Sequence, residues 1–212
     1  MKTTCVILGA VGSLCAASAI AGEVYGGIAT SGAELGYGLK LSDQSALRID
    51  AEFVNYKHSF STSDIDYDAK LKFGNAGVFY DWFLGDTFRL TGGALVGTRK
   101  LEGTGRASGG TITINGVAYP AAGESIALDA RFPTVSPYLG LGWGHKQAAK
   151  GAGFYADLGT AIGRPKVKLT ATPGLVAAAG QSNIDAEQQA AQDKADKLRF
   201  YPVIKLGFGY TF

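Results

Sequence analysis

The residues of this chain that could do chemistry are charged side chains spaced two apart. Arg48, Asp50 and Glu52 form one such series, and residues two apart in a β-strand lie on one face. Charges that face a barrel interior must be paired or hydrated, so they predict an interlocked ion-pair network or, alternatively, the lining of a conducting path. The predicted lumen charges are Glu34, Lys40, Arg48, Asp50, Glu52, Asp68, Lys70, Lys72, Arg89, Arg99, Asp157 and Lys205.

A cluster of carboxylates is the one candidate for a metal site. Asp64, Asp66 and Asp68 alternate in SDIDYDAK and would share one face of a strand. A calcium loop of the EF-hand type would need Gly at position 69 and Glu at 75, where the chain has Ala69 and Asn75. We therefore interpret this segment as a solvated acidic rim, and expect no metal and no cofactor.

The two histidines are the candidates for acid–base catalysis. The same-face neighbours of His58 are Tyr56 and Phe60, so no Ser/His pair forms locally, and His145 falls at the opposite end of the predicted barrel. The glycines of LGLGWG are spaced by two within a strand, unlike a dinucleotide fingerprint. We expect no catalytic residue and no enzyme, while a lipid-modifying enzyme with a partner from another strand stays an alternative.

Segments of alternating polarity must position these residues. We find eight, at 23–29, 33–41, 46–58, 66–83, 87–101, 137–144, 153–163 and 200–212. Their connections are alternately short and long, as in outer-membrane barrels, except that the first connection, TSG, falls on the long-loop side but is short. The phase of the fourth blurs after Asn75, where we expect a bulge, and the seventh could run on to Thr170. Whether 23–41 is one strand or two stays open.

Glycines decide which face of these strands is outside. Glycines such as Gly142 and Gly207 occupy the polar face, where they weaken a strand but leave room for large side chains inside a narrow barrel. The apolar face then meets lipid. Aromatic residues at the short-turn end predict a membrane-interface girdle. They are Trp82, Phe83, Phe88, Trp143, Phe154, Tyr210 and Phe212. A soluble lipid-binding barrel, with the apolar face inward, is a further alternative.

Length and composition fit one exported domain. The 212 residues include 31 Gly and are 46% hydrophobic and 18% charged, which disfavours disorder. Residues 1–22 read as a cleaved signal peptide, with a single Lys2 before an apolar stretch that holds both cysteines, and 23–212 as the barrel domain. Without Lys2, 19 Lys and Arg face 18 Asp and Glu, so we expect no nucleic-acid partner.

Two long loops carry local structure of their own. The segment TITINGVAYP has β-forming residues on both sides of Asn115-Gly116, which predicts a hairpin that stands as an external arm. In the last loop, Ser182 precedes Asp185 by three residues and predicts the capped start of a short helix.

At this point the chain resembles a known family. The stretch PYLGLGWGHKQAAKGAGFYADLGTAIGRPKV, the segment NIDAEQQAAQDKADKL and the ending FYPVIKLGFGYTF are similar to a largely uncharacterised family of small outer-membrane β-barrel proteins of Gram-negative bacteria, related to the OmpA, OmpX and OmpW barrels. The resemblance implies an outer-membrane location after export. It also implies that Tyr210 and Phe212 form the signal that the outer-membrane assembly machinery reads.

We therefore predict an all-β fold, an eight-stranded antiparallel up-and-down transmembrane barrel with a short helix in the last long loop. The expected function is non-enzymatic, structural or interacting with an unknown ligand through long extracellular loops. A narrow channel for small or hydrophobic solutes is the first alternative, and a lipid-modifying enzyme the second. Outer-membrane lipid and lipopolysaccharide are the expected surroundings of a monomer.

Overall fold

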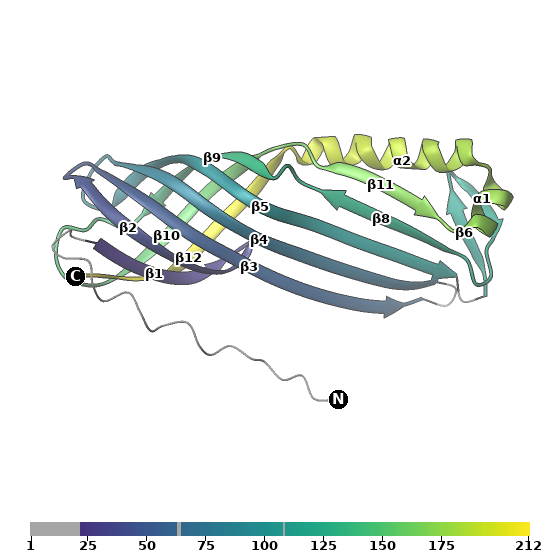
Figure 1. The fold of residues 1–212 in the computed structure, drawn as a ribbon, viewed down its shortest axis with the longest axis horizontal. Coiled ribbons are helices and arrows are strands. Elements are labelled where there is room, and N and C mark those ends of the chain that lie inside the picture. The colour runs from purple at the N-terminus through teal and green to yellow at the C-terminus, as the bar shows by residue number, and fades with distance from the viewer. Residues whose placement is uncertain (1–21, 63–64, 108) are drawn as a thin grey trace, which may run out of the picture.

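The computed structural model describes residues 22–62, 65–107 and 109–212. Eight antiparallel strands form a closed ring, and part of the sheet continues beyond the ring at one end (Figure 1). The ring strands are β1 (Gly22–Ala29), β2 (Gly32–Ser42), β3 (Ser45–Ser61), β4 (Ile65–Phe83), β5 (Phe88–Ala107), β9 (Val135–Trp143), β10 (Gly151–Ile162) and β12 (Phe200–Thr211). β1 pairs with both β2 and β12, which closes the ring. The predicted barrel is confirmed, and 23–41 forms two strands.

The chain enters the ring directly at the start of the described residues. The predicted signal peptide lies outside them except for Gly22, which begins β1 and whose carbonyl accepts a hydrogen bond from the Phe212 N–H at 3.1 Å. In the part of the chain that is described, no helix is both long and apolar enough to span a membrane.

The apolar face of the ring points outward. Ile28, Phe53 and Phe208 are 68%, 66% and 69% exposed, whereas Lys205 and Val203, on the other face of β12, are buried. Alternation of apolar outward and polar inward residues is the pattern of a transmembrane barrel, because lipid takes the place of water around its middle. A soluble barrel would have the two faces reversed.

Three ring strands continue beyond the barrel and carry two more strands, β8 (Ser125–Arg131) and β11 (Lys166–Ala171). We call this five-stranded part, in the order β3-β4-β5-β8-β11, the extension. β10 ends at Ile162, so the seventh segment does not run on to Thr170. Pro165 separates β10 from β11, since proline has no N–H to give to a ladder.

The outward face changes character along β4 although the strand does not bulge. β4 pairs with β3 and β5 in one continuous register, so the predicted bulge at Asn75 is wrong. Towards the short-turn end the outward residues are apolar, as at Val78, whereas beyond Gly74 they are charged, as at Lys72 and Lys70. The blurred phase marks the level at which the surroundings of the strand change from lipid to water.

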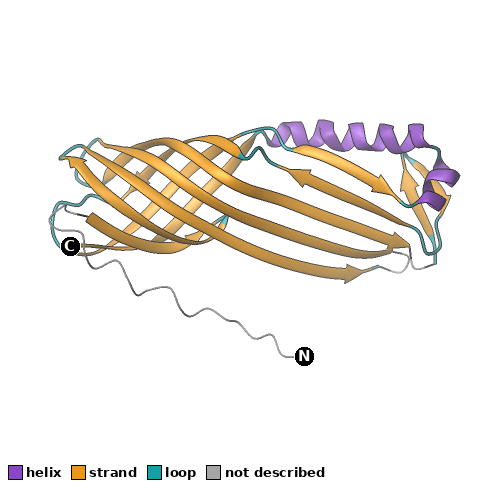
Figure 2. Cartoon of the chain, viewed as in Figure 1, coloured by secondary structure: helices purple, strands orange, loops and turns teal. Residues whose placement is uncertain are grey.

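A small cap covers part of the extension at its far end (Figure 2). It consists of β6 (Thr111–Ile114), β7 (Val117–Pro120), α1 (Pro173–Ala179) and α2 (Gln181–Ala195), which a 3₁₀ turn (Asp196–Leu198) follows. Its buried core is formed by Ala107, Ile112, Ile114, Ala121, Leu175, Ala179 and Ile184. Helices and a hairpin too short to be stable alone are thus held by a shared apolar core.

The predicted hairpin is present, but it is not a free arm. Asn115 and Gly116 have φ values of 50° and 77°, as a tight two-residue turn requires. The Asn115 N–H donates to Glu187 Oε2 at 2.7 Å, and Ile112 and Ile114 are buried in the cap core. The hairpin packs back onto α2, because its apolar side chains are buried there in the core of the cap.

The predicted helix is also present, with a different start and an added role. α2 begins after Gly180, without a side-chain cap, so the predicted capping by Ser182 is wrong. The side-chain oxygens of Gln188 and Gln192 accept hydrogen bonds from the backbone N–H groups of Leu169 and Val167 at 2.9 and 2.8 Å. Two glutamines one turn apart therefore satisfy the free edge of β11.

We predict that the cap unfolds locally when its core is cut. Ile114→Ala should destabilise the cap by about 2–5 kcal/mol, because the Ile114 side chain is fully buried. Limited proteolysis should then cleave the cap while the barrel keeps its heat-modifiable mobility on gels. Val117→Ala is the matched control, since Val117 lies on the same hairpin and is 50% exposed. Equal protease resistance of both variants would contradict this account of the cap.

Candidate functional site in the barrel lumen

The first group of lumen charges is a closed set of two arginines and two aspartates near the short-turn end. Arg48 Nε lies 2.5 Å from Asp81 Oδ2, and Arg48 Nη1 lies 3.3 Å from Asp157 Oδ2. Arg89 pairs with the same two carboxylates, with Nε 3.2 Å from Asp81 Oδ1. All four side chains are buried, so each charge is balanced only by the others.

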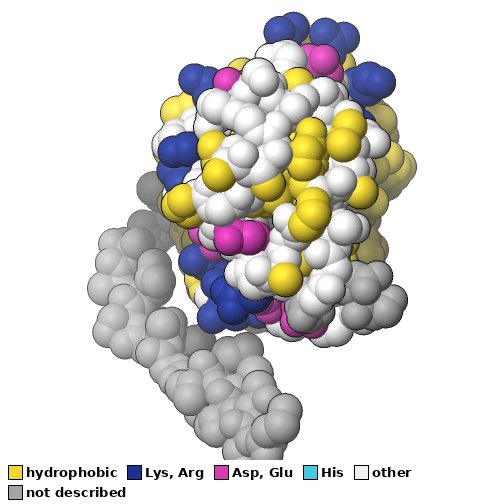
Figure 3. All heavy atoms as spheres, turned by 90° about the vertical axis from the view of Figure 1, so that its right-hand side faces the viewer, with side chains coloured by type: hydrophobic (Ala, Val, Ile, Leu, Met, Phe, Trp, Pro, Cys, Tyr) yellow, Lys and Arg dark blue, Asp and Glu magenta, His cyan; other side chains and the backbone are white. Residues whose placement is uncertain are grey.

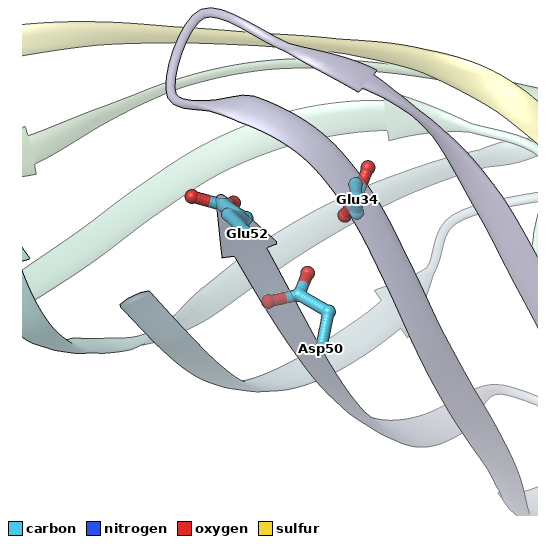
Figure 4. Close-up of side chains that lie close together, drawn as sticks. All are labelled: Glu34, Asp50 and Glu52. Atoms are coloured by element: carbon cyan, nitrogen blue, oxygen red, sulfur yellow. The ribbon is translucent and has the colours of Figure 1, made fainter. Parts of the chain in front are cut away.

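The second group surrounds one ammonium. Lys205 Nζ lies 2.9 Å from Glu34 Oε1, 2.6 Å from Asp50 Oδ2 and 2.5 Å from Glu52 Oε1. Glu34 projects from β2, and Asp50 and Glu52 project from β3 into the same space (Figure 4). These buried carboxylates have the donor set of a metal site, but the ammonium of Lys205 already supplies the cation among them.

Tyrosine rings fill the space between and beside these charges. Tyr25, Tyr138 and Tyr155 are 1–2% exposed. A Cβ added to Gly207 would lie 2.5 Å from the Tyr155 hydroxyl oxygen, and one added to Gly159 would lie 2.7 Å from Tyr138 Cε2. The inward glycines therefore make room chiefly for aromatic rings, which the sequence analysis did not identify. The lumen is packed with side chains of both kinds.

A turn closes the lumen at the short-turn end. Gly144 and His145 have φ values of 84° and 61°, and these left-handed residues turn the chain inward between β9 and β10. His145 Nδ1 lies 2.7 Å from Glu23 Oε2, and its ring lies 4.2 Å from that of Tyr155. Gln147 is also buried and lines a cavity of about 240 Å³ at this end.

An arginine and three aromatic rings close the lumen at the other end. Arg99 Nη2 donates to Pro133 O at 2.8 Å and to Ser136 Oγ at 2.5 Å. The Arg99 guanidinium lies 5.8 Å from the Phe132 ring centroid, and Phe132 and Phe73 both pack edgewise on Tyr201. Both ends of the lumen are thus occupied by side chains.

Four predicted lumen charges lie elsewhere. Asp68, Lys70 and Lys72 point outward on the extension, because the phase of β4 is set by its buried residues Phe73 and Phe79. Lys40 lies at the short-turn rim, where it pairs with Asp43 at 2.8 Å. The other eight are buried in the lumen: Glu34, Arg48, Asp50, Glu52, Arg89, Arg99, Asp157 and Lys205.

Besides the tyrosines, two carboxylates and one imidazole of the lumen were not predicted: Asp81, Glu23 and His145. Asp81 was not predicted because the alternation of polar and apolar residues is unclear after Asn75. Its neighbours Tyr80 and Trp82 point outward, which places Asp81 on the inner face. Glu23 is the first residue after Gly22 and alternates with Val24 in β1. His145 had no local signal, because its inward position depends on the turn that carries it.

The aromatic girdle has one wrong member. Trp82, Trp143, Phe154, Tyr210 and Phe212 are 42–56% exposed on the outer face at the short-turn end. Phe83 is buried and points inward, as it must in a strand whose preceding residue Trp82 points outward. Phe88 is half-buried, with its ring 5.5 Å from that of Trp143.

The remaining candidates lie on the extension. Asp66 and Asp68 share the outer face of β4, and the Ser59 hydroxyl donates to Asp68 at 2.5 Å. Asp64, the third predicted carboxylate, lies outside the described residues. His58 lies on the inner face, between Tyr56 and Phe60, with ring centroids 6.2 and 6.0 Å away.

Comparison with known proteins supports the fold. No protein-family model and no curated protein sequence matches the chain. The crystal structure of Acinetobacter baumannii CarO2 aligns with a TM-score of 0.65 at 18% identity, covering 91% of this chain and 99% of that one. That of Acinetobacter baumannii CarO aligns with a TM-score of 0.59 at 16% identity, covering 91% and 97%. These neighbours are outer-membrane β-barrel proteins, so the chain has the fold of such barrels.

We predict that the arginine–aspartate group fails as a unit when one carboxylate is neutralised. Asp157→Asn should destabilise the barrel by about 3–5 kcal/mol, because Arg48 and Arg89 would share one remaining buried carboxylate. Urea unfolding of the refolded protein in lipid vesicles, followed by tryptophan fluorescence, measures the change. Asp86→Asn serves as the control, since Asp86 is fully exposed and pairs only with Lys146. Equal unfolding midpoints for Asp157→Asn and the parent chain would refute the proposed interdependence.

Proposed function

We propose that this chain is an integral outer-membrane barrel protein of a Gram-negative bacterium that neither conducts ions nor catalyses a reaction. Its extension and cap would form a contact surface for another molecule outside the cell. The observation that carries the proposal is a contrast between two regions. The lumen is filled by interlocked charges and tyrosine rings, whereas the extension and cap form a second folded layer with a core of its own.

The location and orientation follow from the same features. Tight turns and exposed tryptophans at one end suit the periplasmic interface, and long loops at the other suit the cell surface. Both termini would then be periplasmic, and export would depend on a signal peptide at 1–22. Tyr210 and Phe212 at the end of β12 would serve as the assembly signal. The relation to the OmpA, OmpX and OmpW barrels belongs to the same proposal.

A narrow channel is the second candidate because of the turn that closes the short-turn end. This turn is tied to the barrel wall by side-chain contacts: His145 pairs with Glu23, and the carbonyl of Gly144 accepts a hydrogen bond from Arg89 Nη1 at 3.0 Å. The amide oxygen and nitrogen of Gln147 are both buried and make no hydrogen bond within the described residues. The unsatisfied amide of Gln147 favours the channel, because movement of this turn out of the lumen would open a path past the arginine–aspartate group.

Single-channel recording of the refolded protein in planar bilayers separates the two candidates. We expect no discrete openings at physiological salt, since the ion pairs of Arg89 are buried and leave no continuous water path. Openings whose conductance changes in Arg89→Gln would overturn the proposal in favour of a channel. Folding is verified beforehand by heat-modifiable mobility on gels, so that an absence of channel openings is measured on a folded barrel.

Two further measurements test the other parts of the proposal. Membrane fractionation should place the protein with outer-membrane markers, and recovery from the soluble periplasm would refute the location. Mass spectrometry of membrane lipids should show no new species on overexpression. A new species that His58→Ala abolishes would support the lipid-modifying enzyme instead.

A further inference from the structure

The outer face of the extension carries a row of basic residues set by strand register. Lys72 on β4 lies directly opposite Lys100 on β5, and Lys100 lies opposite Arg131 on β8. Arg131 in turn lies opposite Lys166 on β11. We call these four residues the basic row. Four adjacent strands thus place cations side by side on one face.

Folding gains nothing from such an arrangement. Like charges directly opposite one another destabilise a sheet. Two carboxylates offset part of the repulsion: Glu102 pairs with Lys72 at 3.4 Å and with Lys100, and Asp129 pairs with Lys100 and Arg131 at 2.8 and 2.7 Å. The neighbouring cations hold the pKa of Asp129 at about 2, so this carboxylate is charged at physiological pH.

Positive charge nevertheless remains in excess around the row. Lys166 makes no ion pair with any residue that the structure describes. The next row outward places Lys57, Lys70 and Lys168 on the same face, in line with Glu102 and Asp129. Seven cations thus face two carboxylates over these two rows. Viewed from the cap end, Lys and Arg side chains gather at the top and along the left side of the molecule (Figure 3).

The row lies where the apolar outer surface ends. From the short-turn end outward, the outer face of β4 carries Val78, Ala76 and Gly74 and then Lys72. The outer face of β5 carries Val96 and Thr98 and then Lys100. At about 3.3 Å per residue, Lys72 lies roughly 13 Å along the strand from Ala76. Headgroup layers lie within that distance of the hydrocarbon core. With strands tilted by about 40°, the separation is roughly 10 Å along the membrane normal, so the Lys72 ammonium at the end of its flexible side chain reaches headgroup level.

A shallow cavity adjoins the row and could take part of a headgroup. Its volume is about 350 Å³. Its charged lining consists of Lys70, Arg131 and Lys168 together with Asp68, Glu102 and Asp129. Arginine can bind a phosphate through two parallel hydrogen bonds, whereas lysines act as point charges. The three cations of the cavity are balanced by its three carboxylates, so the excess positive charge that a phosphate would meet lies in the adjoining basic row.

We propose that the basic row binds the phosphate groups of a phosphorylated glycolipid in the outer leaflet of the membrane that holds the barrel. The inference rests on the proposed outer-membrane location and deepens it, because it assigns the contact with the surrounding glycolipid to the four residues of the basic row. The row would recognise the lipid by its negative charge and by the position of its phosphates in the membrane. The phosphates lie at the level of the row, and the apolar outer face of the barrel contacts the acyl chains. Binding would relieve the repulsion within the row.

The test compares the parent chain with two variants of equal charge change. The first carries Lys72→Gln, Lys100→Gln, Arg131→Gln and Lys166→Gln. The control carries Lys146→Gln, Lys150→Gln, Lys194→Gln and Lys197→Gln, which remove cations outside the row. Each refolded protein in zwitterionic detergent is titrated with bis-phosphorylated lipid A and with dephosphorylated lipid A, and its thermal unfolding midpoint and ligand affinity are measured.

Phosphorylated lipid A should raise the unfolding midpoint of the parent and of the control, and bind the row variant on the order of a hundredfold more weakly. Without lipid, the row variant should unfold near the parent's midpoint, because the loss of repulsion within the row offsets the loss of the ion pairs to Glu102 and Asp129. Equal affinity for dephosphorylated lipid A, equal weakening in the control, or saturation by inorganic phosphate at the same concentration would each overturn the proposal. Fractionation tests the location separately, since this binding is measured in detergent.

Discussion

One constraint governs this molecule: three of its strands cross from lipid into water without any change of register. β3, β4 and β5 pair continuously from the barrel into the extension. A slip of one residue would turn every side chain to the other face, so the register must suit both surroundings at once. The outer face is therefore apolar up to Gly74 and charged from Lys72 onward, and the inner face changes in the opposite sense.

The lumen follows from the same constraint. Polar residues of the membrane-spanning part can only turn inward, where an eight-stranded ring has room for little besides its own side chains. Charges in that space persist only when each is balanced, and the pairing of Arg48, Arg89, Asp81 and Asp157 achieves this without solvent. Removing any one member leaves an uncompensated buried charge. Such a network fixes one arrangement of the ring strands. Its charges are already paired with one another, so the surfaces left to bind other molecules lie on the outside of the protein.

The sequence alone predicts the ring strands well because their alternation is enforced on both faces. β12 is the clearest case, with outward Phe208 and inward Lys205 in the predicted phase. The prediction from alternating polarity fails where the outer face of a strand passes from lipid to water. Lys72 and Asp68 were assigned to the lumen because charged residues were expected to point inward along the whole strand. β8 was hidden in a long loop, and β11 was considered only as a continuation of the seventh segment, because β11 pairs with β8, and β8 pairs with the part of β5 beyond the barrel. The inward turn at His145 depends on backbone angles that few sequence features reveal.

The two edges of the extension are unequal. α2 occupies the edge of β11, whereas residues 54–61 of β3 pair only with β4 among the residues that the structure describes. A sheet with two open edges can add copies without end, but one with a single open edge can meet only the same edge of a second copy. Any association of this sheet by strand pairing must therefore stop at a two-fold symmetric pair. The two glutamines of α2 thus prevent the sheet from adding further strands at the β11 edge.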